Sequence, residues 1–152
     1  VAAEPLVHHR DVVERRGGVV QVVLGSGQLQ PLLVMAQRVV DQLQAYCADS
    51  SIQIDLPLVI EGTDFQRRVW DQIARIPPGS TRTYGELARR LNSAARAVGQ
   101  ACGDNRLPLA IPCHRVVAAS GLGGFAHHRG GAYQRIKRWL LMHEAGGELR
   151  LA

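Results

Sequence analysis

The fold is decided by the stretch TYGELARRLNSAARAVG, residues 83–99, in which two short helical patterns flank a tight polar turn. Thr83 and Glu86 match a capping box: the Thr83 hydroxyl can accept from the backbone N–H of Glu86, and the Glu86 carboxylate can reach back to the N–H of Thr83. This predicts a helix over about residues 84–91. Asn92-Ser93 ends it, and Ser93 can cap a second helix. Two short helices joined in this way predict a helix-turn-helix.

The second helix begins with small side chains around one long cation. Ala94, Ala95 and Ala97 surround Arg96. Small residues would let the helix backbone approach a duplex closely, and Arg96 alone would be long enough to reach into it. The alternative is an alanine-rich helix packed in a core, with Arg96 on the protein surface.

Charge is distributed unevenly along the chain. The formal net charge is +5, with a balance of −2 over residues 1–60 and +7 over residues 61–152, and seventeen of the eighteen basic residues are Arg. Basic charge gathered in one part of a chain favours a polyanionic partner, with nucleic acid as the first candidate. The alternative is a GC-rich genome that uses Arg rather than Lys on a solvated surface.

The composition is that of an ordinary globular chain. With 152 residues, 46% hydrophobic and 20% charged, it forms one domain or two small ones and is not disordered. No apolar run approaches the roughly 18 residues of a membrane helix, so we expect no membrane partner, and no leader resembles a signal peptide. Cys47, Cys102 and Cys113 cannot all pair with one another, which favours a cytoplasmic location.

The fold class expected is α+β. A strand over 19–24, a helix from Pro31 and an alternating strand over 52–58 predict a small, structural αβ domain, residues 1–60. Residues 61–152 are predicted to form a mostly helical C-terminal domain that contains the helix-turn-helix and a candidate active-site cysteine.

That cysteine lies in the segment IPCHRVV, residues 111–117. A thiolate is the nucleophilic form of cysteine, so a reactive Cys113 needs a base or a positive charge nearby, and His114 and Arg115 follow it directly. In an extended segment adjacent side chains point to opposite faces, so His114 would act through a water. The alternative is that Cys113 is a small buried hydrophobe.

No metal site is predicted. His8-His9 is a possible ligand pair, but no third ligand has a suitable spacing, and a solvated segment is favoured. A zinc site built from Cys102, Cys113 and His114 lacks the short spacing between ligands that such sites show.

The segment Pro112-Cys113-His114-Arg115-Val116 resembles the active-site signature of the O6-alkylguanine-DNA alkyltransferases, also called methylated-DNA–protein-cysteine methyltransferases. The resemblance covers about residues 46–146, and its other motifs are Gly62-Thr63-Asp64-Phe65-Gln66 with Val69-Trp70, Thr83-Tyr84-Gly85-Glu86-Leu87-Ala88, Ala94-Ala95-Arg96-Ala97-Val98-Gly99, Asn105, and Lys137-Arg138-Trp139-Leu140-Leu141 with His143-Glu144.

The resemblance implies a DNA repair protein. It would flip an O6-alkylguanine out of duplex DNA and move the alkyl group irreversibly to Cys113, so that each molecule acts once. No cofactor is implied, and the partner is double-stranded DNA that contains O6-alkylguanine. We expect a monomer that can cluster on DNA.

The resemblance also implies roles for individual residues. Cys113 is the nucleophile, His114 takes its proton through a water, and Glu144 orients His114, as in a catalytic triad. Asn105 braces the turn beneath the site, and Tyr84 crowds the phosphate beside the lesion and can protonate the leaving guanine. The remaining assignments are a DNA-binding set (Arg96, which fills the vacated stack, with Ala95, Gly99, Thr83, Tyr84 and Arg115) and a substrate pocket (Val116, Lys137 and Phe125, which replaces the usual tyrosine).

Each role has a plainer alternative, and the chain departs from the family pattern in places. Glu144 could be solvated, Asn105 a turn residue and Tyr84 ordinary packing. The helix-turn-helix turn is about two residues short, and residues 126–131 look inserted or remodelled where the pocket lid lies. This loop could add a phosphate contact, change which alkyl groups fit, or be a solvated segment.

Two other functions compete with repair. The first is a non-enzymatic protein that binds alkylated lesions; such relatives lack the acceptor cysteine, whereas Cys113 is present here. The second is a plain helix-turn-helix DNA-binding domain, which usually acts as a dimer.

Overall fold

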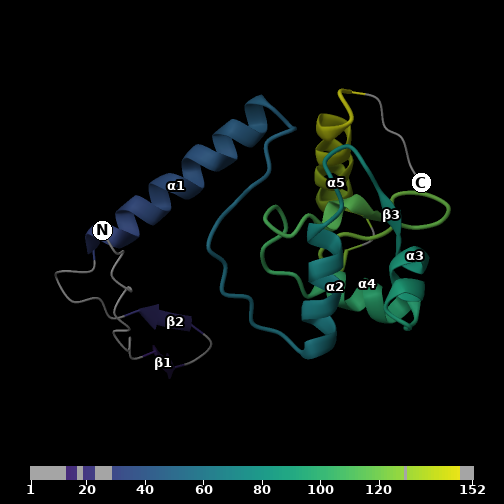
Figure 1. The fold of residues 1–152 in the computed structure, drawn as a ribbon, viewed down its shortest axis with the longest axis horizontal. Helices are drawn as coiled ribbons and strands as arrows, with labels where there is room; N and C mark the ends of the chain where they lie inside the picture. Colours follow the sequence, from purple (N-terminus) through teal and green to yellow (C-terminus); the bar gives the residue numbers. More distant parts are fainter. Residues whose placement is uncertain (1–12, 17–18, 23–28, 129, 148–152) are drawn as a thin grey trace, which may run out of the picture. The chain divides into compact units, whose positions relative to one another are not determined.

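The fold of the chain was analysed in a computed structural model, which describes residues 13–16, 19–22, 29–128 and 130–147 (Figure 1). These residues form a mixed, helix-dominated structure with two small two-stranded sheets. The chain divides into two compact units, Val1–Val40 and Asp41–Ala152. This division falls within a helix, whereas the sequence predicts a domain boundary near residue 60.

The first unit contains a hairpin and the start of a long helix. Strands β1 (Val13–Arg16) and β2 (Val19–Val22) pair antiparallel, with Val13 opposite Val22. The predicted strand is thus confirmed over 19–22, and β1 was not predicted. Helix α1 (Leu29–Ala48) confirms the helix expected from Pro31. The His8-His9 pair lies outside the described residues.

The strand predicted over residues 52–58 is wrong. The segment has no regular structure, although Ile54, Leu56 and Leu58 are partly buried and the residues between them are exposed, as the pattern indicates. Ile52 is exposed. A strand needs a partner for its backbone groups, and here the side chain of Gln42 takes that place. Its amide donates to the carbonyl of Asp55 and accepts from the N–H of Asp55, both at 2.7 Å.

Four further helices build the second unit: α2 (Asp64–Ala74), α3 (Tyr84–Arg90), α4 (Ala95–Gly103) and α5 (Gly131–Glu144). Helix α4 packs against both α2 and α3. The Trp70 indole of α2 donates to the carbonyl of Ala101 in α4 at 2.8 Å, which satisfies a carbonyl at the helix end. The buried core includes Val69, Trp70, Ile73, Leu87, Val98, Ile111, Val116 and Leu140.

The helix-turn-helix is present as predicted, with one difference at its turn. The capping box of Thr83 and Glu86 is confirmed in both directions. Asn92 has a positive φ of 50°, and the Ser93 N–H bonds the carbonyl of Ala88 at 2.9 Å, as in a Schellman motif. Ser93 takes part in the C-terminal motif of α3, and the N-cap of α4 is Ala94, whose side chain cannot cap the helix. The prediction that Ser93 caps the second helix is therefore wrong.

A short parallel pairing joins the helix-turn-helix to the cysteine segment. Strand β3 (Arg82–Thr83) runs directly into α3 and pairs with β4 (Val116–Val117). The cysteine itself lies in η1 (Cys113–Arg115), a single 3-10 turn, so the extended conformation predicted for this segment is wrong. The 3-10 turn leads directly into β4, and β4 pairs with β3, which leads directly into α3. This pairing fixes the position of Cys113 relative to the start of α3.

Candidate active site

Cys113 lines a cavity of about 310 Å³ in the second unit, a size at the lower end of small-molecule sites. The cavity walls come from α3, α4, η1 and the loop before α5. The lining residues are Tyr84, Arg96, Gly99, Gln100, Cys102, Gly103, Cys113, Gly124, Phe125, Ala126, His127 and His128.

Asn105 braces the chain that leads to Cys113. Its amide donates to the carbonyl of Ile111 at 2.8 Å, and its carbonyl oxygen accepts from the N–H of Leu107 at 2.9 Å. The Cys113 N–H in turn donates to the carbonyl of Ile111 at 2.7 Å. The place expected for Asn105 beneath the cysteine turn therefore agrees with its contacts.

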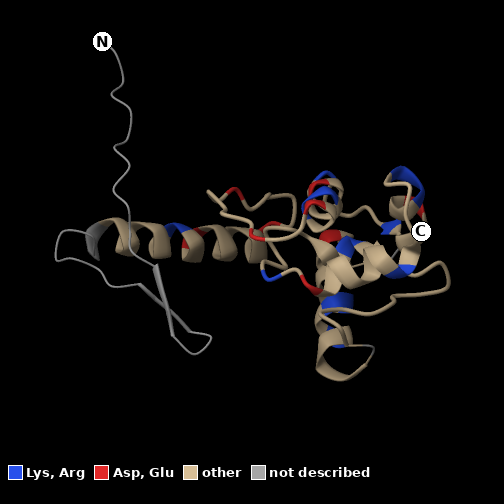
Figure 2. Cartoon of the chain, turned by 90° about the horizontal axis from the view of Figure 1, so that it is seen from below, with Lys and Arg blue, Asp and Glu red and all other residues tan. Residues whose placement is uncertain are grey.

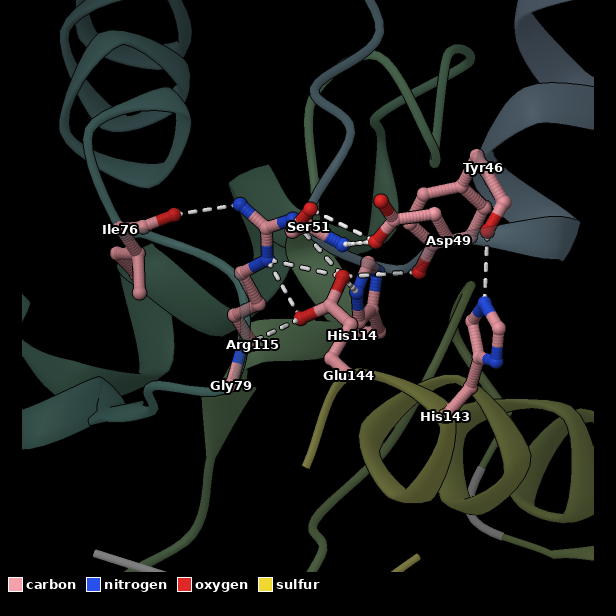
Figure 3. A network of polar contacts seen from close by, with 9 residues as sticks. All are labelled: Tyr46, Asp49, Ser51, Ile76, Gly79, His114, Arg115, His143 and Glu144. Carbon is pink, nitrogen blue, oxygen red and sulfur yellow. Dashed lines mark hydrogen bonds and ion pairs between the residues drawn. The ribbon is translucent and has the colours of Figure 1, made fainter. Parts of the chain in front are cut away.

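The carboxylate of Glu144 accepts hydrogen bonds from separate segments of the chain (Figure 3). Oε1 faces Nε2 of His114 at 2.8 Å and accepts from the Tyr46 hydroxyl at 2.8 Å. Arg115 donates to both oxygens, with Nε to Oε2 at 2.9 Å and Nη2 to Oε1 at 2.8 Å. The backbone N–H of Gly79 donates to Oε2 at 3.2 Å. Glu144 is thus not a solvated residue at a helix end.

These bonds set the charge of Glu144. Burial alone would raise its pKa, but the hydrogen bonds from His114 and Arg115 and the positive charge of Arg115 outweigh burial and lower the pKa to about 2. Glu144 is therefore ionised at neutral pH. An ionised carboxylate accepts hydrogen bonds only, so the proton between Glu144 and His114 lies on Nε2 of the imidazole.

His114 is placed to accept a second proton. Burial lowers its pKa, with the bond to Glu144 opposing the shift, so the ring is neutral at pH 7. With the proton on Nε2, the lone pair lies on Nδ1. Nδ1 is buried and has no hydrogen-bond partner within the described residues. His114 can therefore act as a general base through Nδ1.

Cys113 is 4% exposed, and burial raises the pKa of its thiol, with Asn105 and Lys137 opposing the shift. The resting form at neutral pH is the thiol. A nucleophilic step at this sulfur consequently needs a base to remove the proton, and His114 is the neighbouring residue in the chain with that capacity.

The structure corrects the expectation that Arg115 binds DNA. Arg115 is buried, with 3% of its surface exposed. Its guanidinium donates hydrogen bonds to the Glu144 carboxylate and to the carbonyl of Ile76. A guanidinium held in this way does not reach a phosphate. Arg115 instead ties α5 to the end of α2.

Two residues assigned to the pocket lie beneath its walls. Val116 and Lys137 are fully buried, and neither lines the cavity. The Lys137 ammonium donates to the carbonyls of Val116 and Gly124, the latter at 2.9 Å. Burial lowers its pKa to about 8. Lys137 thereby joins β4 to the loop that forms one wall, while Phe125 lines the cavity as expected.

Apart from Arg115, the residues assigned to DNA lie in α3, in α4 and at the N-cap of α3. Arg96 is exposed, lines the cavity and shares it with Gly99 and Tyr84. The Tyr84 hydroxyl donates to the carbonyl of Gly124 at 3.2 Å. Ala95 is exposed at the start of α4, whereas Thr83 uses its hydroxyl in the capping box. Lys and Arg residues occur in several elements of the described chain, with Asp and Glu residues among them (Figure 2).

The sequence did not reveal Tyr46, Cys102 or the pair formed by Asp104 and His127. Tyr46 is 3% exposed and its ring packs edge-on against His143, at 5.3 Å between ring centres. It is 98 positions from Glu144, and no local pattern links two residues so far apart. Cys102 lies four positions after Val98 on the buried side of α4, a spacing that could have placed it beside the cysteine site.

Within the described residues, no group of three His, Cys, Asp or Glu side chains could hold a metal ion. In the same part of the chain, no helix has the length and apolar character required to cross a membrane.

The fold and the site define a class: a helix-turn-helix protein with a cysteine, a histidine and a glutamate buried in the same unit as the helix-turn-helix. A family model described as the DNA binding domain of 6-O-methylguanine DNA methyltransferase matches residues 64–146. The chain belongs to this family.

Relatives and solved structures agree with this membership. The chain is 50% identical over 105 residues to a methylated-DNA–protein-cysteine methyltransferase of Mycobacterium bovis (67% of this chain, 61% of that protein). It is 45% identical over 108 residues to the one of Shigella flexneri (68% and 60%). The chain spans about three-fifths of the length of these curated relatives.

Among solved structures, the O6-methylguanine methyltransferase of Mycobacterium tuberculosis matches with a TM-score of 0.65 and 43% identity, over 74% of this chain and 67% of that one. A structure of the Mycobacterium tuberculosis OGT in complex with DNA matches with a TM-score of 0.63 and 43% identity (72% and 65%).

The Tyr46 hydroxyl provides a test of the network. In Tyr46→Phe, Oε1 of Glu144 loses the hydrogen bond from the Tyr46 hydroxyl. The negative charge on the carboxylate is then less well compensated, so Glu144 stabilises a protonated His114 more strongly. The pKa of His114 should rise, and the acid limb of the pH profile of Cys113 alkylation should move to higher pH. Tyr133→Phe, at an exposed tyrosine of α5, is the matched control. An acid limb that stays in place in Tyr46→Phe would refute this coupling.

Proposed function

We propose that the protein repairs DNA by moving the alkyl group of an O6-alkylguanine to Cys113. The observation that carries this proposal is a protonated, buried thiol in the cavity next in sequence to a neutral His114, whose Nδ1 has no hydrogen-bond partner in the part of the chain that the structure describes. Membership of the 6-O-methylguanine DNA methyltransferase family supports the same reaction.

The reaction would be a single displacement. His114 Nδ1 takes the thiol proton, through a water, while the sulfur attacks the alkyl carbon. The bond between that carbon and guanine O6 breaks as the bond between carbon and sulfur forms. The guanine takes a proton, which the Tyr84 hydroxyl can donate and recover from solvent. The product is a thioether, so the protein is consumed, and no cofactor enters the balance.

Ionised Glu144 would act as a positioning residue that keeps the proton of His114 on Nε2 and stabilises the imidazolium that forms. Asn105 would hold the cysteine turn in place. Phe125 would pack against the flipped base, and Val116 and Lys137 would support the pocket wall from behind.

The bound form of the substrate would be a flipped nucleotide in duplex DNA. A base inside a stack cannot reach a cysteine in a cavity, so the lesion must leave the helix. The exposed start of α4 supports a close approach to the duplex at Ala95 and Gly99, with Arg96 filling the space that the base vacates and Thr83 and Tyr84 at the phosphate. For Arg96, Gly99 and Tyr84 this assignment rests on their placement around the cavity. For Thr83 and Ala95 it rests on their positions at the starts of α3 and α4.

We also propose an oligomeric state, a division of roles between the two parts of the chain, and a cellular location. The chain would work as a monomer that can cluster on DNA, with residues 1–60 structural and residues 61–152 carrying DNA binding and alkyl transfer. A reducing cytoplasm suits a thiol acceptor, which must stay free to react.

Mass spectrometry tests the reaction itself. After incubation with duplex DNA that contains O6-methylguanine, we expect one added methyl group per protein, located on Cys113 by peptide analysis. Cys113→Ser should carry none, and Cys47→Ser, at an exposed cysteine, should react as the unchanged protein does. Tight binding of the lesion without any adduct would overturn alkyl transfer and favour a protein that only recognises damage.

Arg96 provides a test of base flipping. Arg96→Ala should slow repair of the lesion in duplex DNA by tenfold or more, about 1.4 kcal/mol in activation free energy, because flipping loses its stabilising side chain. The reaction with the free base O6-benzylguanine should change little, since no stack has to open. Rates on the two substrates, followed by adduct formation, make the comparison. Equal losses on both would contradict the role of Arg96.

A further inference from the structure

One wall of the cavity is a tight turn with an unusual backbone. Phe125 and His128 pair through both of their backbone groups, at 2.8 and 2.9 Å. The two residues between them, Ala126 and His127, have positive φ angles of 48° and 64°. Hairpin turns with this geometry usually contain Asn and Gly, because other residues are strained there. The surroundings must therefore hold the turn in place.

The side chain of His127 supplies one such contact. Its Nε2 lies 2.8 Å from Oδ1 of Asp104, the residue that follows α4. The other oxygen of Asp104 accepts from the Gln66 amide at 2.8 Å, and Gln66 itself belongs to the capping box of α2. The carboxylate that receives His127 is thus fixed by the start of another helix.

On the other side of the turn, His128 stacks on Tyr133 in the first turns of α5, with 4.0 Å between ring centres and 5° between the planes. The two histidines therefore fasten the turn to two different helices, α4 through Asp104 and α5 through Tyr133. Both histidines line the cavity that contains Cys113.

Gly103 provides the space for the His127 ring. A Cβ atom at this position would lie 2.3 to 2.7 Å from three atoms of the imidazole, which is too close for any real contact. Since Gly103 also lines the cavity, a glycine here lets the imidazole lie directly against the end of α4. Any larger residue would push His127 off Asp104 and move the cavity wall.

We propose that His127, fastened to Asp104 over Gly103, is a specificity-determining wall that limits the size of the alkyl group transferred to Cys113. The inference rests on the proposed function. A cavity of about 310 Å³ must hold the guanine and its O6 substituent together, so the position of a wall decides how much room remains for the substituent. With the wall fastened, a methyl group fits and a bulky group competes with the imidazole for space.

The test compares O6-methylguanine and O6-benzylguanine as free bases, so that contacts with DNA do not enter. Alkylation of Cys113 is followed by mass spectrometry in His127→Ala and in Gly103→Ala. We expect the ratio of the benzyl rate to the methyl rate to rise about tenfold or more in both variants, since excess or missing space in a pocket changes rates by this order. Gly85→Ala is the control, because a Cβ there meets only one atom, at 3.9 Å.

The outcomes separate this proposal from its alternatives. A ratio that stays unchanged in His127→Ala overturns the proposal. If His127→Ala instead slows duplex repair equally for both alkyl groups and leaves the free bases unaffected, His127 contacts DNA and does not select the alkyl group. Failure of the unchanged protein to react with any substrate refutes the proposed function itself. If Gly103→Ala does not fold, the result for His127→Ala alone decides the proposal. The His127 side chain is half-exposed, so this variant is expected to fold.

Discussion

The second unit depends on one buried carboxylate. Glu144, the last residue of α5, receives hydrogen bonds from Tyr46 in α1, from Gly79 after α2, and from His114 and Arg115 in the cysteine turn. Removing a charge from water costs several kcal/mol unless its partners replace the lost hydration. Each of these segments must therefore reach its position for the carboxylate to be satisfied, and the cysteine turn is fixed by the same requirement.

The same carboxylate determines the chemistry. Held ionised by His114 and Arg115, it leaves the imidazole neutral with its lone pair on Nδ1, while burial keeps the neighbouring thiol protonated. A stable thiolate would be open to solvent electrophiles and oxidants. In this arrangement the thiol would remain protonated until a substrate binds and the base removes the proton, which suits the single-use alkyl transfer proposed above.

Local features of the fold were predictable from the sequence, and contacts between distant residues were not. The capping box of Thr83 and Glu86 and helix α1 follow from side-chain chemistry and periodicity within a few residues. The strand predicted over residues 52–58 did not form. Alternation of apolar and polar residues indicates that one side of a segment is buried, but it does not supply a partner strand. Cys113 was predicted to be the nucleophile from its neighbours and from a family resemblance. The burial of Arg115 could not be predicted in this way, because it depends on Glu144, 29 positions away. The turn at His127 depends on Gly103, the last residue of α4, and on Asp104, which follows it and lies 23 positions from His127.

The most direct test of the account is the protonation state of His114. With ¹⁵N-labelled histidine, two-bond ¹H–¹⁵N correlation spectra at pH 7 distinguish the two neutral tautomers from the imidazolium, and His114→Asn assigns the signal among the six histidines. We expect a neutral ring with its proton on Nε2 and an unprotonated Nδ1. An imidazolium at pH 7, or a neutral ring with its proton on Nδ1, would contradict it, because neither form could accept the proton of Cys113.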